Sequence, residues 1–298
     1  MINMPSLNIL ITGAGGQLGS EFRYLAENCE KELNFIFTTR KDLNIQNTQQ
    51  VSDFCTKNKI NTIVNCAAYT AVDKAEQEPK QADAINHLAV KNLAQIAKEQ
   101  NISLIHISTD YVFDGTAHKP YKETGATNPQ SVYGKTKLDG ELAMQAINPA
   151  NSIIIRTSWV YSEFGNNFVK TMIRLGQERG ELSVVCDQIG SPTNARDLAK
   201  TILQIMPQLV EQKLEKTDVN QAVEIYHYSN AGICSWYDFA HAIFEINNID
   251  CKLNPIPSEA YPTPAKRPYY SVMDKSKIVE RFKLDCVHWR ESLSAGEC

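Results

Sequence analysis

Apolar segments of strand length recur through the first half of the chain, and each is followed by a longer segment compatible with a helix. The apolar residues come in continuous runs, such as Ile9-Leu10-Ile11, rather than alternating with polar ones. Continuous runs are typical of parallel strands that are covered on both faces. The pattern therefore predicts an α/β fold with a doubly wound parallel sheet. We expect its first strands at Leu7–Thr12, Asn34–Thr38, Thr62–Asn65, Ser103–Ser108 and Ser152–Arg156.

The regular alternation of predicted strands and helices ends after about Trp159. We predict a first domain over residues 1–160, to which the chain returns near residues 195–230, and a smaller mixed lobe over residues 161–298 that covers the strand ends. The polar stretch Gln208–Asn220 is interpreted as a surface excursion. The other elements expected in this half are helices near Phe168–Leu175, Ala195–Met206 and Trp236–Ile246, a strand at Glu224–Ser229 and a proline-rich passage from Pro255 to Pro268.

Composition narrows the class of protein. With 298 residues, 43% of them hydrophobic, the chain can bury a full core without metals or disulfides. Its net charge of −4 and its scattered basic residues argue against nucleic acid as a partner. The eight cysteines include no Cys-x-x-Cys pair, so we expect reduced thiols and no metal site. The short apolar run Leu7–Ile11 predicts neither a signal peptide nor a membrane span, and we expect a cytoplasmic protein.

The first predicted strand leads directly into a glycine-rich turn. Gly13, Gly16 and Gly19 lie at a G-x-x-G-x-x-G spacing where a helix should begin. Glycines allow a positive φ, a close approach of backbone amides to a pyrophosphate and tight helix–strand packing, while the helix N-terminus favours the anion. An ordinary tight turn is the alternative. The place of the turn after the first strand favours a dinucleotide site in a Rossmann-type domain.

The end of the second predicted strand bears on the choice of cofactor. An acidic residue there would bind the ribose 2′-hydroxyl of NAD, whereas an arginine can accept the 2′-phosphate of NADP. The chain has Arg40 at this place, which favours NADPH or tolerance of both NADPH and NADH. An ordinary solvated charge is the other interpretation of Arg40. Asp42 and Leu43, just beyond, are placed to flank the adenine.

Tyr133 and Lys137 form a Tyr-x-x-x-Lys pair on one face of a predicted helix. A free tyrosine, with a pKa of about 10, is a poor acid for carbonyl reduction near neutral pH. We expect the ammonium of Lys137 to lower the pKa of Tyr133 and to hold the nicotinamide ribose. Tyr133 then donates its proton to the oxyanion that forms when hydride reaches a carbonyl carbon. The spacing also occurs by chance in many helices.

Thr109 follows the fourth predicted strand, and ligands of open parallel sheets bind beyond the carboxyl ends of the strands. Its hydroxyl can therefore hydrogen-bond a substrate carbonyl and complete a catalytic set with Tyr133 and Lys137. A role in capping the next turn is the alternative for Ser108 and Thr109.

These residues resemble the extended short-chain dehydrogenase/reductase family, through the glycine turn, Asn65-Cys66-Ala67-Ala68, Ser108-Thr109-Asp110 and the Tyr-Lys pair. Within it, longer strings are similar to those of the dTDP-4-dehydrorhamnose reductases, and the similarity covers nearly the whole chain. These strings are Ala71-Val72-Asp73-Lys74-Ala75-Glu76, Ser108-Thr109-Asp110-Tyr111-Val112-Phe113, Arg156-Thr157-Ser158-Trp159-Val160-Tyr161, Gln188-Ile189-Gly190-Ser191-Pro192-Thr193 and Arg267-Pro268.

The resemblance implies reduction of the C4 ketone of dTDP-4-dehydro-β-L-rhamnose to dTDP-L-rhamnose by NADPH or NADH, with residues 161–298 as the substrate-binding lobe. It implies that the cofactor is contacted by Gly16, Gln17, Leu18, Asp42, Leu43, Cys66, Ala67 and Ala68, in addition to Tyr133 and Lys137. It implies that the sugar nucleotide is contacted by Thr109, Asp110, Tyr133, Trp159 and Arg267.

Other activities of the same family stay open. A dehydratase would need two carboxylates after Thr109, where this chain has only Asp110 before Tyr111. An epimerase that retains NAD would favour an acidic residue at the place of Arg40. A non-catalytic regulatory subunit of the same fold is a further alternative. Some members are described with Mg²⁺ at a contact between subunits, which would imply a homodimer, but the sequence shows no metal-ligand spacing.

Overall fold

A six-stranded parallel sheet forms the centre of the computed structural model, which describes residues 7–27, 33–215 and 222–295. The strand order is β10-β5-β4-β3-β1-β2, so the chain reverses its direction of growth between β1 and β3. The strands are β1 (Leu7–Thr12), β2 (Leu33–Thr38), β3 (Thr62–Asn65), β4 (Ser103–Thr109), β5 (Ile153–Thr157) and β10 (Glu224–His227). All six predicted strands are therefore confirmed, with ends shifted by one or two residues.

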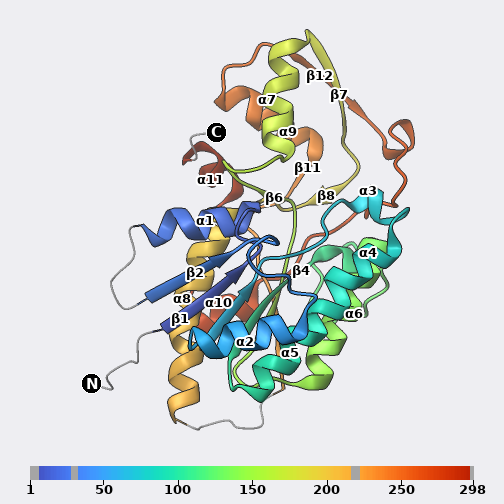
Figure 1. Ribbon diagram of the computed structural model, residues 1–298. Coiled ribbons are helices and arrows are strands. Elements are labelled where there is room, and N and C mark those ends of the chain that lie inside the picture. The colour runs from blue at the N-terminus through green and yellow to red at the C-terminus, as the bar shows by residue number, and fades with distance from the viewer. Residues whose placement is uncertain (1–6, 28–32, 216–221, 296–298) are drawn as a thin grey trace.

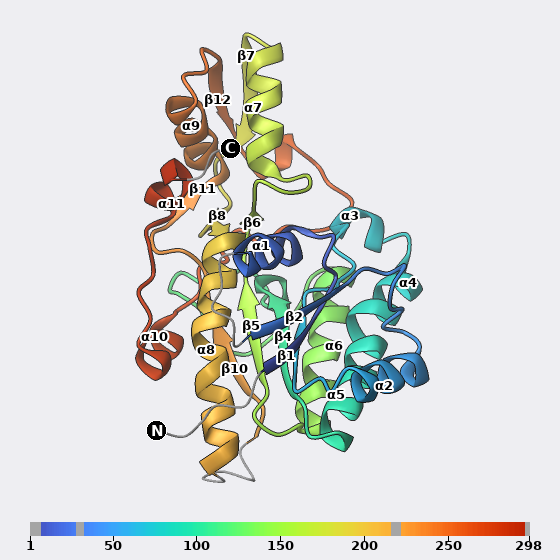
Figure 2. The same cartoon turned by 60° about the vertical axis from the view of Figure 1, so that its left-hand side comes forward.

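Helices cover both faces of this sheet (Figure 1, Figure 2). One face carries α1 (Gln17–Ala26), α8 (Ala195–Glu215) and α10 (Ser276–Phe282), and the other carries α2 (Thr48–Lys57), α5 (Ala89–Glu99) and α6 (Val132–Ile147). Neighbouring strand residues point to opposite cores, as Ile9 and Leu10 do. Because both faces are buried, the strands are apolar throughout, and the predicted doubly wound α/β class is confirmed.

A smaller lobe stands over one end of the sheet (Figure 1). Its core packs α7 (Phe168–Glu178) and α9 (Trp236–Ile246) against the parallel pair β7 (Glu181–Val185) and β12 (Lys252–Ile256). Short pairs complete it, namely β6 (Val160–Tyr161) with β9 (Thr193–Asn194) and β8 (Ile189–Gly190) with β11 (Cys234–Ser235), and α11 (Trp289–Ala295) lies beside them.

Segments from the second half of the chain also belong to the sheet layer. Helix α8 and strand β10 join it, and α10 packs on both of them. The division into a domain of residues 1–160, with a return near 195–230, and a lobe of residues 161–298 stays a proposal. The remaining elements are α3 (Val72–Ala75), α4 (Pro79–Asp83), the π-helix η1 (Ala84–Leu88) and the 3₁₀ helices η2 (Asp110–Val112) and η3 (Ser258–Ala260).

The expected surface excursion at Gln208–Asn220 is wrong for its first part. Helix α8 does not end at Met206 but continues through Pro207 to Glu215, and residues 216–220 lie outside the described ones. A proline inside a helix costs about 3 kcal/mol because it removes one backbone hydrogen bond. Burial of Leu209 and Val210 against the sheet core offsets this cost.

Candidate active site

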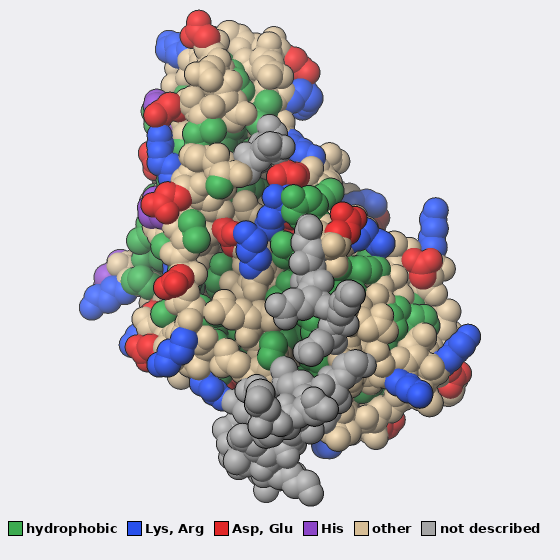
Figure 3. Space-filling view, turned by 90° about the vertical axis from the view of Figure 1, so that its left-hand side faces the viewer, with side chains coloured by type: hydrophobic (Ala, Val, Ile, Leu, Met, Phe, Trp, Pro, Cys, Tyr) green, Lys and Arg blue, Asp and Glu red, His purple; other side chains and the backbone are tan. Residues whose placement is uncertain are grey.

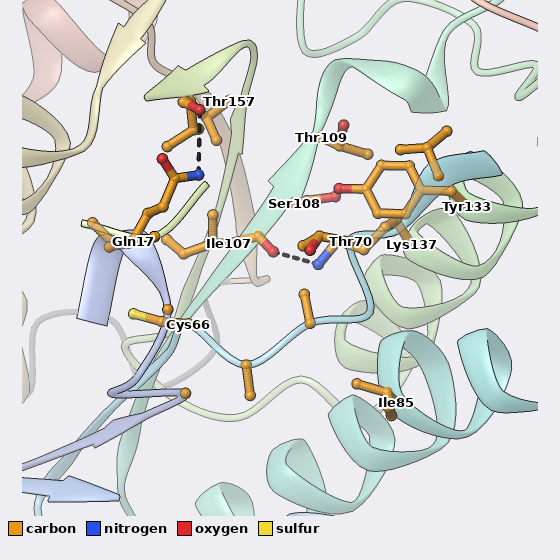
Figure 4. A pocket seen from close by; sticks show the side chains of 18 of the residues that line it. Gln17, Cys66, Thr70, Ile85, Ile107, Ser108, Thr109, Tyr133, Lys137 and Thr157 are labelled. Carbon is orange, nitrogen blue, oxygen red and sulfur yellow. Dashed lines mark hydrogen bonds between the residues drawn. The ribbon is translucent and has the colours of Figure 1, made fainter. Parts of the chain in front are cut away.

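A cleft of about 690 Å³ lies where the carboxyl ends of β1, β3, β4 and β5 meet the small lobe. This place coincides with the reversal of strand order, where open α/β sheets bind their ligands. Figure 4 shows side chains from the glycine turn, β4 and α6 facing one another across it. The predicted site residues that line the cleft are Gly13, Gly16, Gln17, Leu18, Arg40, Leu43, Cys66, Ala67, Ala68, Thr109, Asp110, Tyr133, Lys137 and Trp159.

The glycine turn has the backbone that an anion site needs. Gly13 has a φ of +64°, and a Cβ atom there would lie 2.7 Å from the Cα atom of Ala67. Gly16 caps α1 at the cleft, so the first amides of this helix face the cavity. Gly19 does not line the cleft: a Cβ there would lie 2.6 Å from the Cα of Ala14, so this glycine serves helix–strand packing.

The loop after β2 closes the far end of the cleft. Arg40 and Leu43 line it, whereas Asp42 does not. The carboxylate of Asp42 instead accepts hydrogen bonds from the backbone amide and the hydroxyl of Thr39, at 2.8 and 2.7 Å. These bonds hold the pKa of Asp42 below its usual value and fix the turn that presents Arg40.

Tyr133 lies in the first turn of α6, which Ser131 caps by accepting a hydrogen bond from the amide of Gly134. Its hydroxyl points into the cleft beside Thr109 (Figure 4). Burial raises the pKa of Tyr133 to about 12, and a hydrogen bond with Thr109 acts in the opposite direction. The ring of Tyr111 packs edge-on against that of Tyr133, with centroids 5.6 Å apart.

Lys137 lies one turn further along α6 and is buried. Its Nζ donates a 2.5 Å hydrogen bond to the carbonyl oxygen of Ile107 on β4 (Figure 4). Burial lowers the pKa of Lys137 to about 8, while Glu141 acts in the opposite direction. The expected lowering of the Tyr133 pKa by Lys137 is not found in this structure, because Lys137 is bonded to the strand backbone and desolvation dominates at Tyr133.

The part of the cleft that is predicted to hold the sugar, which we call the sugar end, is lined by Asp110 and Trp159. Asp110 is 2% exposed, and burial raises the pKa of its carboxyl group to about 6. Trp159 has a φ of +48°, uncommon for a bulky residue, and its ring stacks on that of Trp236 with centroids 3.6 Å apart. Local strain of this kind clusters at functional sites.

Arg267 does not line the cleft but lies behind it. Its Nη2 donates a 2.6 Å hydrogen bond to Asp73 on α3, and the amide of Ala265 donates to the other oxygen of the same carboxylate. This pairing fastens residues 258–273, which we call the C-terminal strap, to the cleft wall. The strap is also held where the amide of Tyr270 donates to the carbonyl of Gly115.

Several polar residues behind the cleft have no predicted role. His106 on β4 lies against Lys137, and the carboxylate of Glu141 is paired with Arg156 at 2.6 Å, both partners being almost fully buried. A signal for both was present: one histidine and one arginine interrupt otherwise apolar strands, and buried polar groups need partners. Tyr111 and Trp236 were missed because their contacts are not visible from spacing.

One group of described residues has the geometry of a metal site, Asp83, His87 and Asp139. These residues are partly exposed, none lines the cleft, and Asp83 and His87 already share a hydrogen bond. Among the described residues, none that line the cleft form such a group, and no step of a reaction is assigned to the Mg²⁺ that the resemblance raised.

Comparison with known proteins extends the resemblance to the whole chain. The family described as RmlD substrate binding domain matches residues 7–296. A dTDP-4-dehydrorhamnose reductase of Aggregatibacter actinomycetemcomitans is 42% identical over 295 residues, which are 96% of each chain. A crystal structure of a dTDP-4-dehydrorhamnose reductase from Clostridium acetobutylicum is 44% identical and superposes with a TM-score of 0.88 over 97% of both chains.

A second solved structure includes a cofactor. The dTDP-4-dehydrorhamnose reductase of Bacillus anthracis, determined in complex with NADP, is 38% identical, with a TM-score of 0.86 over 97% of both chains. Identity at this level over almost the full length, together with the cleft geometry, decides the family. The chain belongs to the dTDP-4-dehydrorhamnose reductases.

Proposed function

We propose that this chain reduces the C4 ketone of dTDP-4-dehydro-β-L-rhamnose to dTDP-L-rhamnose, the last step of dTDP-rhamnose biosynthesis, with NADPH or NADH as the reductant. The observation that carries the proposal is that Tyr133 and Thr109 share one cleft with the glycine turn. In the proposed enzyme, the proton donor and the dinucleotide site therefore face the same cavity. Membership in the reductase family supplies the class of substrate.

The residues of the cleft fit a nicotinamide dinucleotide. The amides at the start of α1 and the turn at Gly13 suit the pyrophosphate, because Gly13 and Gly16 line the cavity and have no side chain. Arg40 suits a 2′-phosphate at the end of β2, which favours NADPH. Lys137 suits the nicotinamide ribose. The cofactor supplies the hydride, and the protein supplies its orientation and the proton.

Tyr133 is the proton donor in this proposal. A neutral phenol, favoured by the pKa of about 12, holds its proton until negative charge develops on the ketone oxygen. Thr109, whose hydroxyl donates to Asp110 in this structure, redirects that hydrogen bond to the same oxygen, and Lys137 holds the nicotinamide ribose. At the sugar end, Asp110 accepts hydrogen bonds from sugar hydroxyls and Trp159 packs on the sugar nucleotide. A contact of Arg267 with the diphosphate stays a prediction, because Arg267 lies behind the cleft and is paired with Asp73.

The remaining expectations concern the surroundings of the enzyme. No helix within the described residues is long and apolar enough to cross a membrane. On the face shown in Figure 3, acidic and basic side chains are interspersed and no large area of one sign appears. A cytoplasmic location, the lack of a nucleic-acid partner and a homodimer stay predictions.

The test of the function is direct. Purified protein is mixed with NADPH and enzymatically generated dTDP-4-dehydrorhamnose, and oxidation of the cofactor and identity of the sugar product are followed together, with NADH in a parallel reaction. We expect one cofactor oxidised per dTDP-L-rhamnose formed. Bound cofactor without oxidation would instead favour an epimerase or a non-catalytic subunit.

A further inference from the structure

A row of buried polar groups crosses the sheet beneath the cleft. It consists of Thr12 on β1, Asn65 on β3, His106 on β4 and Lys137 on α6, and each of these residues is at most 2% exposed. Such groups are costly to bury unless each finds a partner. Their partners here are one another, so the row links the glycine turn to the lysine of the proposed catalytic set.

The hydrogen bonds of this row run in one direction. The backbone amide of Ala67, which can only donate, lies 3.4 Å from Oγ1 of Thr12. The hydroxyl of Thr12 donates to Oδ1 of Asn65 at 2.6 Å. The amide nitrogen of Asn65 then lies 3.1 Å from Nδ1 of His106. Because that amide nitrogen carries only donors, Nδ1 must accept, and a neutral imidazole must carry its proton on Nε2.

The protonated Nε2 of His106 faces the catalytic lysine. Nε2 lies 3.4 Å from Nζ of Lys137, whose other partner is the carbonyl oxygen of Ile107 at 2.5 Å. An N–H group at this place can donate to the lone pair of a neutral amine, whereas an ammonium would oppose it with a donor of its own. This direction of the row therefore stabilises neutral Lys137 relative to the ammonium.

We propose that His106 is a positioning residue that acts through Lys137: held by Asn65 with its proton on Nε2, it makes Lys137 give up a proton readily. The role deepens the proposed reduction and rests on it. Tyr133 loses one proton to the product in each turnover, a lysine that releases a proton readily can replace it, and Lys137 then regains its proton from solvent. Burial points the same way, because it lowers the pKa of Lys137 to about 8 and that of His106 well below its usual value.

The carboxyl groups near Lys137 have other hydrogen-bond partners, so the effect on the lysine proton is assigned to His106. On α6, Glu141 lies one turn beyond Lys137, but its carboxylate is paired with Arg156 of β5 at 2.6 Å and also accepts a hydrogen bond from the hydroxyl of Ser108. Tyr133 lies one turn before it on the same helix. Asp110 of η2 is a buried carboxyl group that lines the cleft, and its Oδ1 accepts a hydrogen bond from Thr109.

The first test determines the tautomer of His106 and needs no enzymatic activity. Long-range ¹H–¹⁵N correlation of ¹⁵N-histidine-labelled protein distinguishes a protonated from an unprotonated ring nitrogen. Signals of His106 are assigned by their loss in His106→Gln. We expect Nε2 protonated and Nδ1 unprotonated throughout pH 6–9. A proton on Nδ1 would overturn the proposal, even if the protein reduces the sugar.

The second test reverses the direction of the row. In Asn65→Asp the new carboxylate only accepts, so His106 must donate from Nδ1, and Nε2 becomes an acceptor that stabilises the ammonium of Lys137. The protonated lysine is the active form, so the rate falls as pH rises through its pKa. The fall of kcat at high pH is the alkaline limb of its pH profile. We expect the midpoint of this alkaline limb to move up by about one pH unit in Asn65→Asp.

Two controls separate this effect from others. His227 on β10 is a second fully buried histidine that does not contact Lys137, so His227→Gln should leave the alkaline limb in place. The double variant Asn65→Asp/His106→Leu keeps the carboxylate but removes the imidazole, and the shift should disappear. A shift that persists there would assign the effect to the carboxylate charge and overturn the role of His106.

The outcomes for function and for His106 remain distinct. If the unmodified protein fails to reduce the sugar, the proposed function fails, and the pH dependence of NADPH binding replaces kcat as the measure of the Lys137 charge. If the sugar is reduced and neither the tautomer nor the limb behaves as expected, only the role of His106 fails. If Asn65→Asp does not fold, the tautomer of the unmodified protein still decides.

Discussion

The two ends of the cleft are built in different ways. The cofactor end is formed by short loops that leave β1, β2 and β3, so its shape follows from the order of the strands. The sugar end depends on pairs that are distant in the chain: Arg267 and Asp73 are 194 residues apart, and Trp159 stacks on Trp236. Changes at the cofactor end should therefore alter cofactor use, whereas changes behind the sugar end should alter substrate binding alone.

The largest effect is expected where the two ends meet. Tyr133→Phe removes the proton donor but keeps the ring that packs on Tyr111, so turnover should fall by about 10²–10⁴-fold. NADPH binding, measured by fluorescence, should be nearly unchanged, because the hydroxyl faces the ketone. Undiminished turnover would remove Tyr133 from the mechanism, and weakened NADPH binding would show that the two ends are not separate at this residue.

Arg40→Gln tests the cofactor end. If Arg40 holds a 2′-phosphate, the ratio of kcat/KM for NADPH to that for NADH should fall by about 10- to 100-fold, the value of a hydrogen bond to a charged group. The KM of the sugar nucleotide should stay the same. Lys41→Gln, on the neighbouring residue that does not line the cleft, is the matched control, and an equal change in both variants would assign the effect to general charge.

Gly190→Ala tests the sugar end by displacing the ring of Trp159. A Cβ at this position would lie 2.6 Å from the ring of Trp159 and 2.8 Å from the hydroxyl of Ser271, so the indole must move. We expect the KM of the sugar nucleotide to rise about tenfold, in line with the cost of overpacking. Gly180→Ala has open space around its Cβ and should change nothing. A change in NADPH affinity would contradict the division.

Asp73→Asn should give the smallest effect. The pair with Arg267 is partly exposed, with 21% and 41% of the two side chains accessible, so its loss should raise the KM of the sugar nucleotide only about three- to fivefold. Steady-state kinetics at two salt concentrations measure the change. Glu245→Gln breaks a more exposed pair with Arg290, remote from the cleft, and serves as the control. No rise in KM would mean that the C-terminal strap is held by its backbone bonds alone.

The same contrast explains how far the sequence could be interpreted. Continuous apolar runs located the strands, and the glycine turn located part of the proposed cofactor end, because these features depend on neighbours in the chain. The sugar end depended on resemblance, since no spacing reveals that Arg267 meets Asp73. The polar stretch from Gln208 misled the prediction of α8, because the helix continues where Leu209 and Val210 are buried.

The chemistry of the catalytic pair was also only partly predictable. The i, i+4 spacing of Tyr133 and Lys137 places them on one face of α6, as expected. The expected influence of the lysine on the tyrosine pKa did not follow, because the Ile107 carbonyl and His106 are brought to Lys137 by β4. A spacing rule within one helix carries no information about the strand beneath it.

The C-terminal strap has a consequence for the order in which the protein is assembled during translation. The sheet layer that carries the cofactor end gains its last strand when β10 ends at His227, whereas Arg267, which fastens the strap, emerges 40 residues later. At ordinary elongation rates this interval is roughly 2 to 8 seconds. A growing chain can thus form its dinucleotide pocket while its sugar pocket still lacks a wall. Cofactor supply, rather than substrate supply, is then what can assist the nascent enzyme.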